Sequence, residues 1–123
     1  MSIPKIHEGE YRFCLVMWEN EPVSAGELAK LCASELGWKR TTTYTVIKRL
    51  GERGVLKNEN GVVTSLISKD DVQSFEIEEL VEKKFQGSLP AFIAAFTRKQ
   101  TLTEKELDQL QSMIDRARKE GGK

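Results

Sequence analysis

The chain has 123 residues, of which 39% are apolar and 31% are charged, and its 19 Lys and Arg residues balance its 19 Asp and Glu residues. This length suits one compact domain or a small domain with an appendage, and the apolar content excludes a wholly disordered chain. The zero net charge disfavours a strongly basic nucleic-acid-binding protein, unless the charge is unevenly distributed along the chain.

Motifs typical of membrane, metal-binding and catalytic proteins do not occur in the sequence. There is no apolar run of about 18 residues, and the N-terminal MSIPKIHEGEYR lacks the order of a secretory signal, so we expect a cytoplasmic protein without direct membrane insertion. Cys14 and Cys32 lie in apolar helical stretches and His7 has no partner at ligand spacing, which indicates buried thiols and no metal or cofactor. Neither thiol has an evident base, so we do not expect an enzyme.

Two helices are predicted at the start of the chain. Apolar residues at helical spacing predict the first from about residue 6 to 19, and an Asn-Glu-Pro segment interrupts it. Ser24-x-x-Glu27 has the capping-box form, in which the two side chains satisfy free backbone N–H groups, so a second helix begins here. That helix runs to about Leu36, because Gly37 suits the left-handed conformation that commonly ends a helix.

The segment KRTTTYTVIKRLGERG predicts a third amphipathic helix, beginning between Lys39 and Thr41. Three successive threonines have poor helix propensity, and a local departure of this kind is often functional. Tyr44, Ile47 and Leu50 are spaced for the core face, and the opposite face carries Thr42, Thr45, Lys48 and Arg49.

A hairpin is predicted after the third helix. Gly54 ends the helix, and two β-prone runs at residues 55–57 and 62–67 flank Asn58-Glu59-Asn60-Gly61, whose Asn-Gly is a strong turn signal. Three helices followed by a hairpin are the order of a winged helix-turn-helix. We therefore predict a mostly α protein with a small β-hairpin, in which residues 1–67 form a winged-helix DNA-binding domain.

The second half is predicted to form a helical dimerisation domain over residues 68–123. Ser68-x-x-Asp71 caps one helix, AFIAAF forms a short one, and Thr103-x-x-Glu106 caps the last. A monomer could hardly bury all three apolar stripes, so we expect a homodimer, although the helices could instead fold back on their own wing. The residues expected in the dimer interface are Val72, Phe75, Leu80, Val81, Phe85, Phe92, Phe96, Leu107, Leu110 and Ile114.

Positive charge is concentrated in and just after the predicted third helix. Between residues 39 and 57 the only acid is Glu52, and the basic residues are Lys39, Arg40, Lys48, Arg49, Arg53 and Lys57. Charge runs are usually solvated faces, but this one coincides with small hydroxyl side chains on the third helix of a helix-turn-helix. That combination indicates double-stranded DNA as the partner.

Each residue type on this helix suits a different DNA contact. The short side chains of Thr41, Thr42 and Thr45 can approach bases in the major groove. Tyr44 fits either the core or a phosphate contact, and we favour DNA. The residues expected mainly as phosphate anchors are Lys39, Arg40, Lys48 and Arg49, of which Arg49 also suits a groove-facing guanine.

Several segments together resemble the BlaI/MecI/CopY family of β-lactamase, methicillin-resistance and copper-homeostasis repressors. These are EYRFCLVMW, ELAKLC, GWKRTTTYTVIKRLGERGVL, FQGSLPAFIAAF and LTEKELDQL. The resemblance implies a homodimeric repressor of an inverted-repeat operator, often with TACA and TGTA half-sites. It also implies that the recognition helix contains Thr41, Thr42, Tyr44, Thr45 and Arg49, and that the dimerising helices lie from Ser68 onward.

Two departures from the family pattern concern the inducing signal. Copper-responsive members carry paired C-x-C motifs near the C-terminus, and this region has no cysteine, which argues against copper sensing. Members relieved by proteolysis are cut at an Asn-Phe bond, and the matching bond here is Ala95-Phe96. A membrane-bound sensor metalloprotease is therefore a candidate partner, although interface packing is the favoured explanation of AFIAAF. A small-molecule-responsive regulator and a protein-interaction module without DNA binding are the alternative functions.

Overall fold

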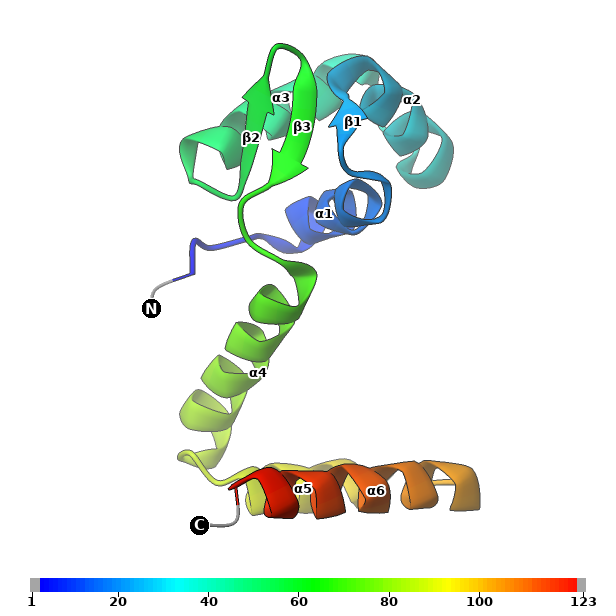
Figure 1. The fold of residues 1–123 in the computed structure, drawn as a ribbon, viewed down its shortest axis with the longest axis vertical. Helices are drawn as coiled ribbons and strands as arrows, with labels where there is room; N and C mark the ends of the chain where they lie inside the picture. Colours follow the sequence, from blue (N-terminus) through cyan, green and yellow to red (C-terminus); the bar gives the residue numbers. More distant parts are fainter. Residues whose placement is uncertain (1–2, 122–123) are drawn as a thin grey trace. The chain divides into compact units, whose positions relative to one another are not determined.

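The computed structural model describes residues 3–121, which form six helices and a small three-stranded sheet (Figure 1). The chain forms two compact units, Met1–Ile77 and Glu78–Lys123, which we call the winged-helix unit and the C-terminal unit. This architecture confirms the predicted winged helix followed by a helical region. No helix in the described range is long and apolar enough to cross a lipid bilayer.

Three helices, α1 (Glu8–Asn20), α2 (Ala25–Leu36) and α3 (Arg40–Glu52), surround the core of the winged-helix unit. The predicted cap of α2 is present, because Ser24 Oγ accepts a hydrogen bond from the Glu27 backbone N–H at 3.1 Å. Gly37 ends α2 in the left-handed conformation, with φ of 72°. The largest fully buried side chains of the core include those of Phe13, Met17, Leu28, Leu50, Leu56 and Val55.

A three-stranded antiparallel sheet in the order β1-β3-β2 covers this helical core. The predicted hairpin is confirmed as β2 (Leu56–Glu59) and β3 (Val62–Ser65). Its turn uses Asn60 and Gly61, both with positive φ (54° and 82°), which is the conformation that Asn-Gly adopts readily. The added strand β1 (Val23–Ser24) pairs with β3, so the segment between α1 and α2 is fixed to the wing.

Helix α4 (Lys69–Phe85) belongs to both units. Its predicted cap is present, with the Asp71 N–H donating to Ser68 Oγ at 3.0 Å. The first turns pack with the winged-helix unit, since Gln73 Nε2 donates to Tyr11 Oη at 3.1 Å and Val72 is only 1% exposed. The division between the two compact units falls after Ile77.

The C-terminal unit contains the end of α4, α5 (Leu89–Thr97) and α6 (Glu104–Gly121). Ser88 and Thr103 cap the last two helices, and the rings of Phe85 and Phe92 meet edge to face at 5.6 Å. Neither α5 nor α6 has a buried residue. The predicted interface residues that are exposed in the protomer are Leu80, Phe96, Leu107, Leu110 and Ile114.

Two of the residues expected in the dimer interface are already buried within the protomer. Val72 is 1% exposed and Val81 is 8% exposed. Val72 is buried because the first turns of α4 pack with the rest of the winged-helix unit. Helical periodicity marks an apolar face but does not say whether the same chain covers it. Phe75, Phe85 and Phe92 remain partly exposed.

Candidate nucleic-acid interface

Helix α3 packs on the core through Ile47 and Leu50, as predicted, but Thr43 takes the place expected for Tyr44. Thr43, Val46, Ile47 and Leu50 are buried, whereas Tyr44 is 37% exposed. The β-branched Thr43 fits between the helices, although its Oγ1 has no hydrogen-bond partner. Adjacent residues on a helix differ by about 100°, so spacing alone left Tyr44 ambiguous. The structure places its ring on the outer face.

Every residue expected to contact DNA lies on the exposed face of α3 or at its N-cap. The exposed residues are Lys39, Arg40, Thr41, Thr42, Tyr44, Thr45, Lys48 and Arg49. Lys39 is the N-cap residue, and α3 begins at Arg40 with no acid in its first turn. The sequence folds this way because the buried stripe of α3 is apolar except for Thr43, and the exposed positions from Arg40 to Arg49 are hydroxyl-bearing or basic.

Hydrogen bonds within α3 restrict two of these side chains. Thr45 Oγ1 donates to the Thr41 carbonyl oxygen at 2.9 Å, so its hydroxyl proton is already used and its oxygen can still accept a hydrogen bond. Arg40 Nη2 donates to Tyr44 Oη at 3.1 Å, and the guanidinium lies 5.4 Å from the centre of the tyrosine ring. The i, i+4 spacing of a cation and an aromatic residue is the sequence signal for this pair.

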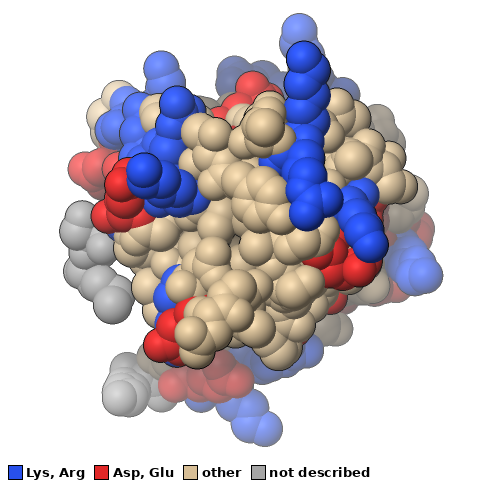
Figure 2. Space-filling view, turned by 90° about the horizontal axis from the view of Figure 1, so that it is seen from above, with Lys and Arg blue, Asp and Glu red and all other residues tan. Residues whose placement is uncertain are grey.

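The positive charge is less extensive than the sequence count indicates. Arg53 forms an ion pair with Glu10, and Lys57 lies 3.3 Å from Glu59. Figure 2 shows Lys and Arg side chains in separate groups around a mainly uncharged area rather than as one continuous basic surface. Within residues 3–121, the basic side chains of this segment that form no ion pair are those of Lys39, Arg40, Lys48 and Arg49.

Comparison with known proteins identifies the family. A family model described as the penicillinase repressor matches residues 6–116. The chain belongs to the penicillinase repressor family. Penicillinase repressors of Bacillus licheniformis and Staphylococcus aureus are each 21% identical to it, over 118 and 115 residues. These alignments cover 93% and 90% of this chain and 92% and 91% of the two relatives, so the similarity includes both units.

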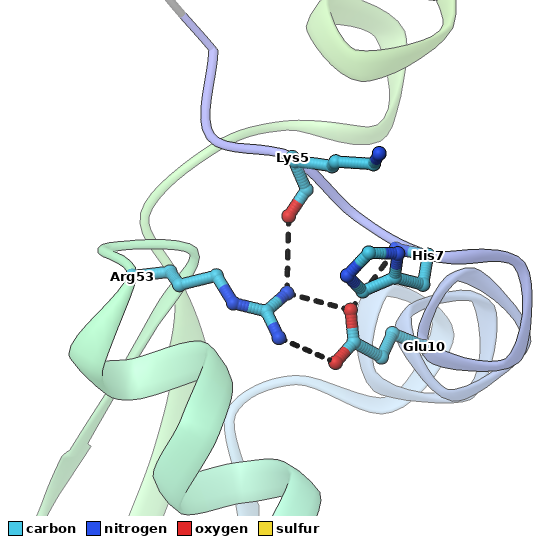
Figure 3. Close-up of polar contacts among 4 residues, drawn as sticks. All are labelled: Lys5, His7, Glu10 and Arg53. Carbon is cyan, nitrogen blue, oxygen red and sulfur yellow. Dashed lines mark hydrogen bonds and ion pairs between the residues drawn. The ribbon is translucent and has the colours of Figure 1, made fainter.

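The ion pair between Glu10 and Arg53 attaches the end of α3 to the start of α1 in this penicillinase repressor family member (Figure 3). Arg53, the C-cap residue of α3, donates to both Glu10 oxygens at 2.6 and 2.8 Å and to the Lys5 carbonyl oxygen at 3.1 Å. Glu10 also accepts from the His7 backbone N–H at 3.0 Å. Glu10 lies on the buried side of α1, with Phe13, Cys14 and Met17.

The Glu10 carboxylate should make stability depend on pH. Hydrogen bonds from Arg53 hold the pKa of Glu10 below its ordinary value of 4.5, although burial opposes them. A lowered folded-state pKa contributes stability that is complete above 4.5 and is lost as the pH falls through the folded-state pKa. Urea titrations from pH 7 to about 3 should therefore show a stability difference between wild type and Glu10→Gln that shrinks in acid.

The control is Glu8→Gln, at an exposed acid in the same turn of α1. Its stability should differ from that of the wild type by less than the stability of Glu10→Gln does, at every pH. A difference between wild type and Glu10→Gln that stays constant down to pH 3 would show that the carboxylate charge does not stabilise the fold.

Both cysteines are buried, as predicted. Burial raises the pKa of the Cys14 thiol to about 12 and also raises the pKa of Cys32. Each thiol is therefore protonated near neutral pH and fully shielded from solvent, which is the opposite of what a nucleophile requires.

The Ala95-Phe96 bond lies inside α5. Ala95 is partly exposed and Phe96 is 49% exposed. Because proteolysis proceeds through locally opened chain segments, cutting this bond requires α5 to unwind.

Proposed function

We propose that this protein is a homodimeric, sequence-specific DNA-binding transcriptional repressor that occupies an inverted-repeat operator and blocks transcription. One observation carries the proposal: the outer face of α3, the second helix of a helix-turn-helix, combines short hydroxyl side chains with unpaired cations. Membership of the penicillinase repressor family supports the same function.

The side chains of α3 suit two stages of binding. Lys39 and Lys48 provide point charges that attract the phosphate backbone before any base is read. Thr41 and Thr42 are short enough for α3 to enter the major groove, where a threonine can hydrogen-bond a base or contact a thymine methyl. Arg49 then suits a phosphate or a guanine edge. Charge provides affinity in this mechanism, and the threonines provide selectivity.

The C-terminal unit supplies the surface for dimerisation. Leu107, Leu110 and Ile114 form an apolar face on α6 and are 43–51% exposed in the protomer. Surfaces of this kind mark interfaces, and an isologous pair of protomers is the commonest way to cover them. Two linked half-sites bind far more tightly than one, so a dimer prefers an operator with two half-sites to DNA that has only one.

A membrane-bound sensor metalloprotease remains a proposed partner. Its support is the position of Ala95-Phe96 in the exposed part of the C-terminal unit, where cutting α5 would weaken the dimer. Incubating the protein with such a protease and mapping the fragments by mass spectrometry tests this, and an intact Ala95-Phe96 bond would remove the protease from the proposal.

Substitutions on the outer face of α3 test the proposed function. Arg49→Ala and Thr42→Ala should each weaken binding to the DNA upstream of the protein's own gene by about tenfold, the usual loss for a base or phosphate contact. Titrations at several salt concentrations measure the affinity, and circular dichroism checks the fold.

Lys105→Ala removes an exposed charge from the C-terminal unit and serves as the matched control, with no expected loss. Normal binding by Arg49→Ala or Thr42→Ala would remove that residue from the interface. Absence of saturable, salt-sensitive and site-selective binding by the wild-type protein would instead favour a protein-interaction module.

A further inference from the structure

The hydrogen-bonded pair of Arg40 and Tyr44 is packed against the neighbouring helix. Gly26 lies in the first turn of α2, and a Cβ atom placed there would be 3.8 Å from Tyr44 Oη and 4.0 Å from Arg40 Nη2. The pair therefore rests on a part of α2 that has no side chain. A methyl group at this position would make ordinary van der Waals contact, whereas a longer side chain would need the space that the pair occupies.

The pair restrains a side chain that is otherwise costly to order. Arginine has several rotatable bonds, and fixing them on binding opposes affinity. The contact with Tyr44 uses one of the five guanidinium N–H donors, so most of them stay available for a ligand. Tyr44 Oη accepts this bond. The arrangement thus presents a preformed group of donors on the surface of the protein.

The location of the pair indicates which part of DNA it meets. In a helix-turn-helix the first helix crosses the sugar-phosphate backbone and the second enters the major groove. Arg40 is the first residue of α3 and its guanidinium lies beside Gly26 in the first turn of α2, so it lies where these two helices come together. We propose that Tyr44 and Gly26 are positioning residues that hold Arg40 ready to bind one phosphate of the DNA backbone, an inference that rests on the proposed function.

A single phosphate can be removed from the interaction without changing the protein. The probe is a duplex selected from random-sequence DNA by the wild-type protein, prepared with one neutral methylphosphonate at each backbone position in turn. For the wild type, each contacted phosphate should appear as a position that weakens binding by about tenfold, the loss expected for a charge-assisted hydrogen bond, and the phosphate bound by Arg40 should be one of them in each half-site. Arg40→Ala should bind the unmodified duplex weakly and show no further loss at that position.

Tyr44→Phe keeps the ring and removes the hydroxyl that accepts from Arg40. It should bind the unmodified duplex about fivefold more weakly, the usual effect of losing one exposed hydrogen bond, and the methylphosphonate at the Arg40 position should reduce its affinity by less than it reduces that of the wild type. Gly26→Ala should behave as wild type, and Gly26→Leu should behave as Tyr44→Phe or bind more weakly. The thermal unfolding midpoint of each variant identifies any loss that is due to the fold.

Three results would overturn the proposal. If Tyr44→Phe keeps both the affinity and the methylphosphonate sensitivity of the wild type, the hydroxyl does not position Arg40. If Tyr44→Phe binds more weakly but keeps that sensitivity, Tyr44 contacts DNA itself. If the wild-type protein selects no duplex at all, the proposed function fails and this inference fails with it.

Discussion

Leu110→Asp is expected to make the protein monomeric and to weaken its binding to paired half-sites by about 100-fold or more, the advantage that linkage of two binding modules provides. Leu110 lies on α6 and is 43% exposed in the protomer, so the substitution removes little packing within its own chain. An aspartate buried in an apolar interface would lose its hydration without gaining a partner. Sedimentation equilibrium measures the dimer, and DNA titration measures the affinity.

The control for this experiment is Ser112→Asp. Ser112 is exposed on α6 at about 200° around the helix from Leu110, so it lies away from the apolar face. This variant adds the same charge and should remain a dimer with unchanged DNA binding. A Leu110→Asp protein that still sediments as a dimer would place the interface elsewhere on the chain.

Arg53→Met is expected to lower the free energy of unfolding by about 2–3 kcal/mol, the range for losing charged hydrogen bonds while a partner stays buried. Methionine preserves the aliphatic stem, so the main change is that the Glu10 carboxylate, whose side chain is 11% exposed, has no cation beside it. Urea unfolding near pH 7 measures the loss.

The matched control is Arg49→Met, one turn earlier on α3, because Arg49 is exposed and forms no ion pair in the range 3–121. The two variants should have opposite effects: Arg49→Met should weaken DNA binding and keep its stability, and Arg53→Met should unfold more easily while the folded fraction still binds. Equal stability of the two variants would show that the ion pair with Glu10 does not stabilise the fold.

Local sequence signals predicted most of the helices and the hairpin. The caps at Ser24 and Ser68 and the left-handed residues Gly37 and Gly61 each act within a few residues of chain, so they can be identified without knowing the fold. The exposed face of α3 was predictable for a similar reason, because its hydroxyl-bearing and basic residues alternate with a buried stripe.

Contacts between distant parts of the chain were not predictable in this way. Strand β1 has two residues and exists because it pairs with β3. Glu10 and Arg53 are 43 residues apart, so no local pattern reveals that one neutralises the other. The choice of Thr43 over Tyr44 for the core depends on the shape of the space between the helices, and periodicity does not resolve neighbouring positions.

The absence of any buried residue in α5 and α6 means that these helices have almost no core of their own. If a second protomer completes that core, folding of the C-terminal unit and assembly are a single equilibrium, and stability increases with protein concentration. The concentration of the dimer, which is the form that binds the operator, then varies with about the square of the protomer concentration when dimers are scarce. A modest fall in synthesis or a modest rise in degradation would thus release the operator more sharply than a monomeric repressor could.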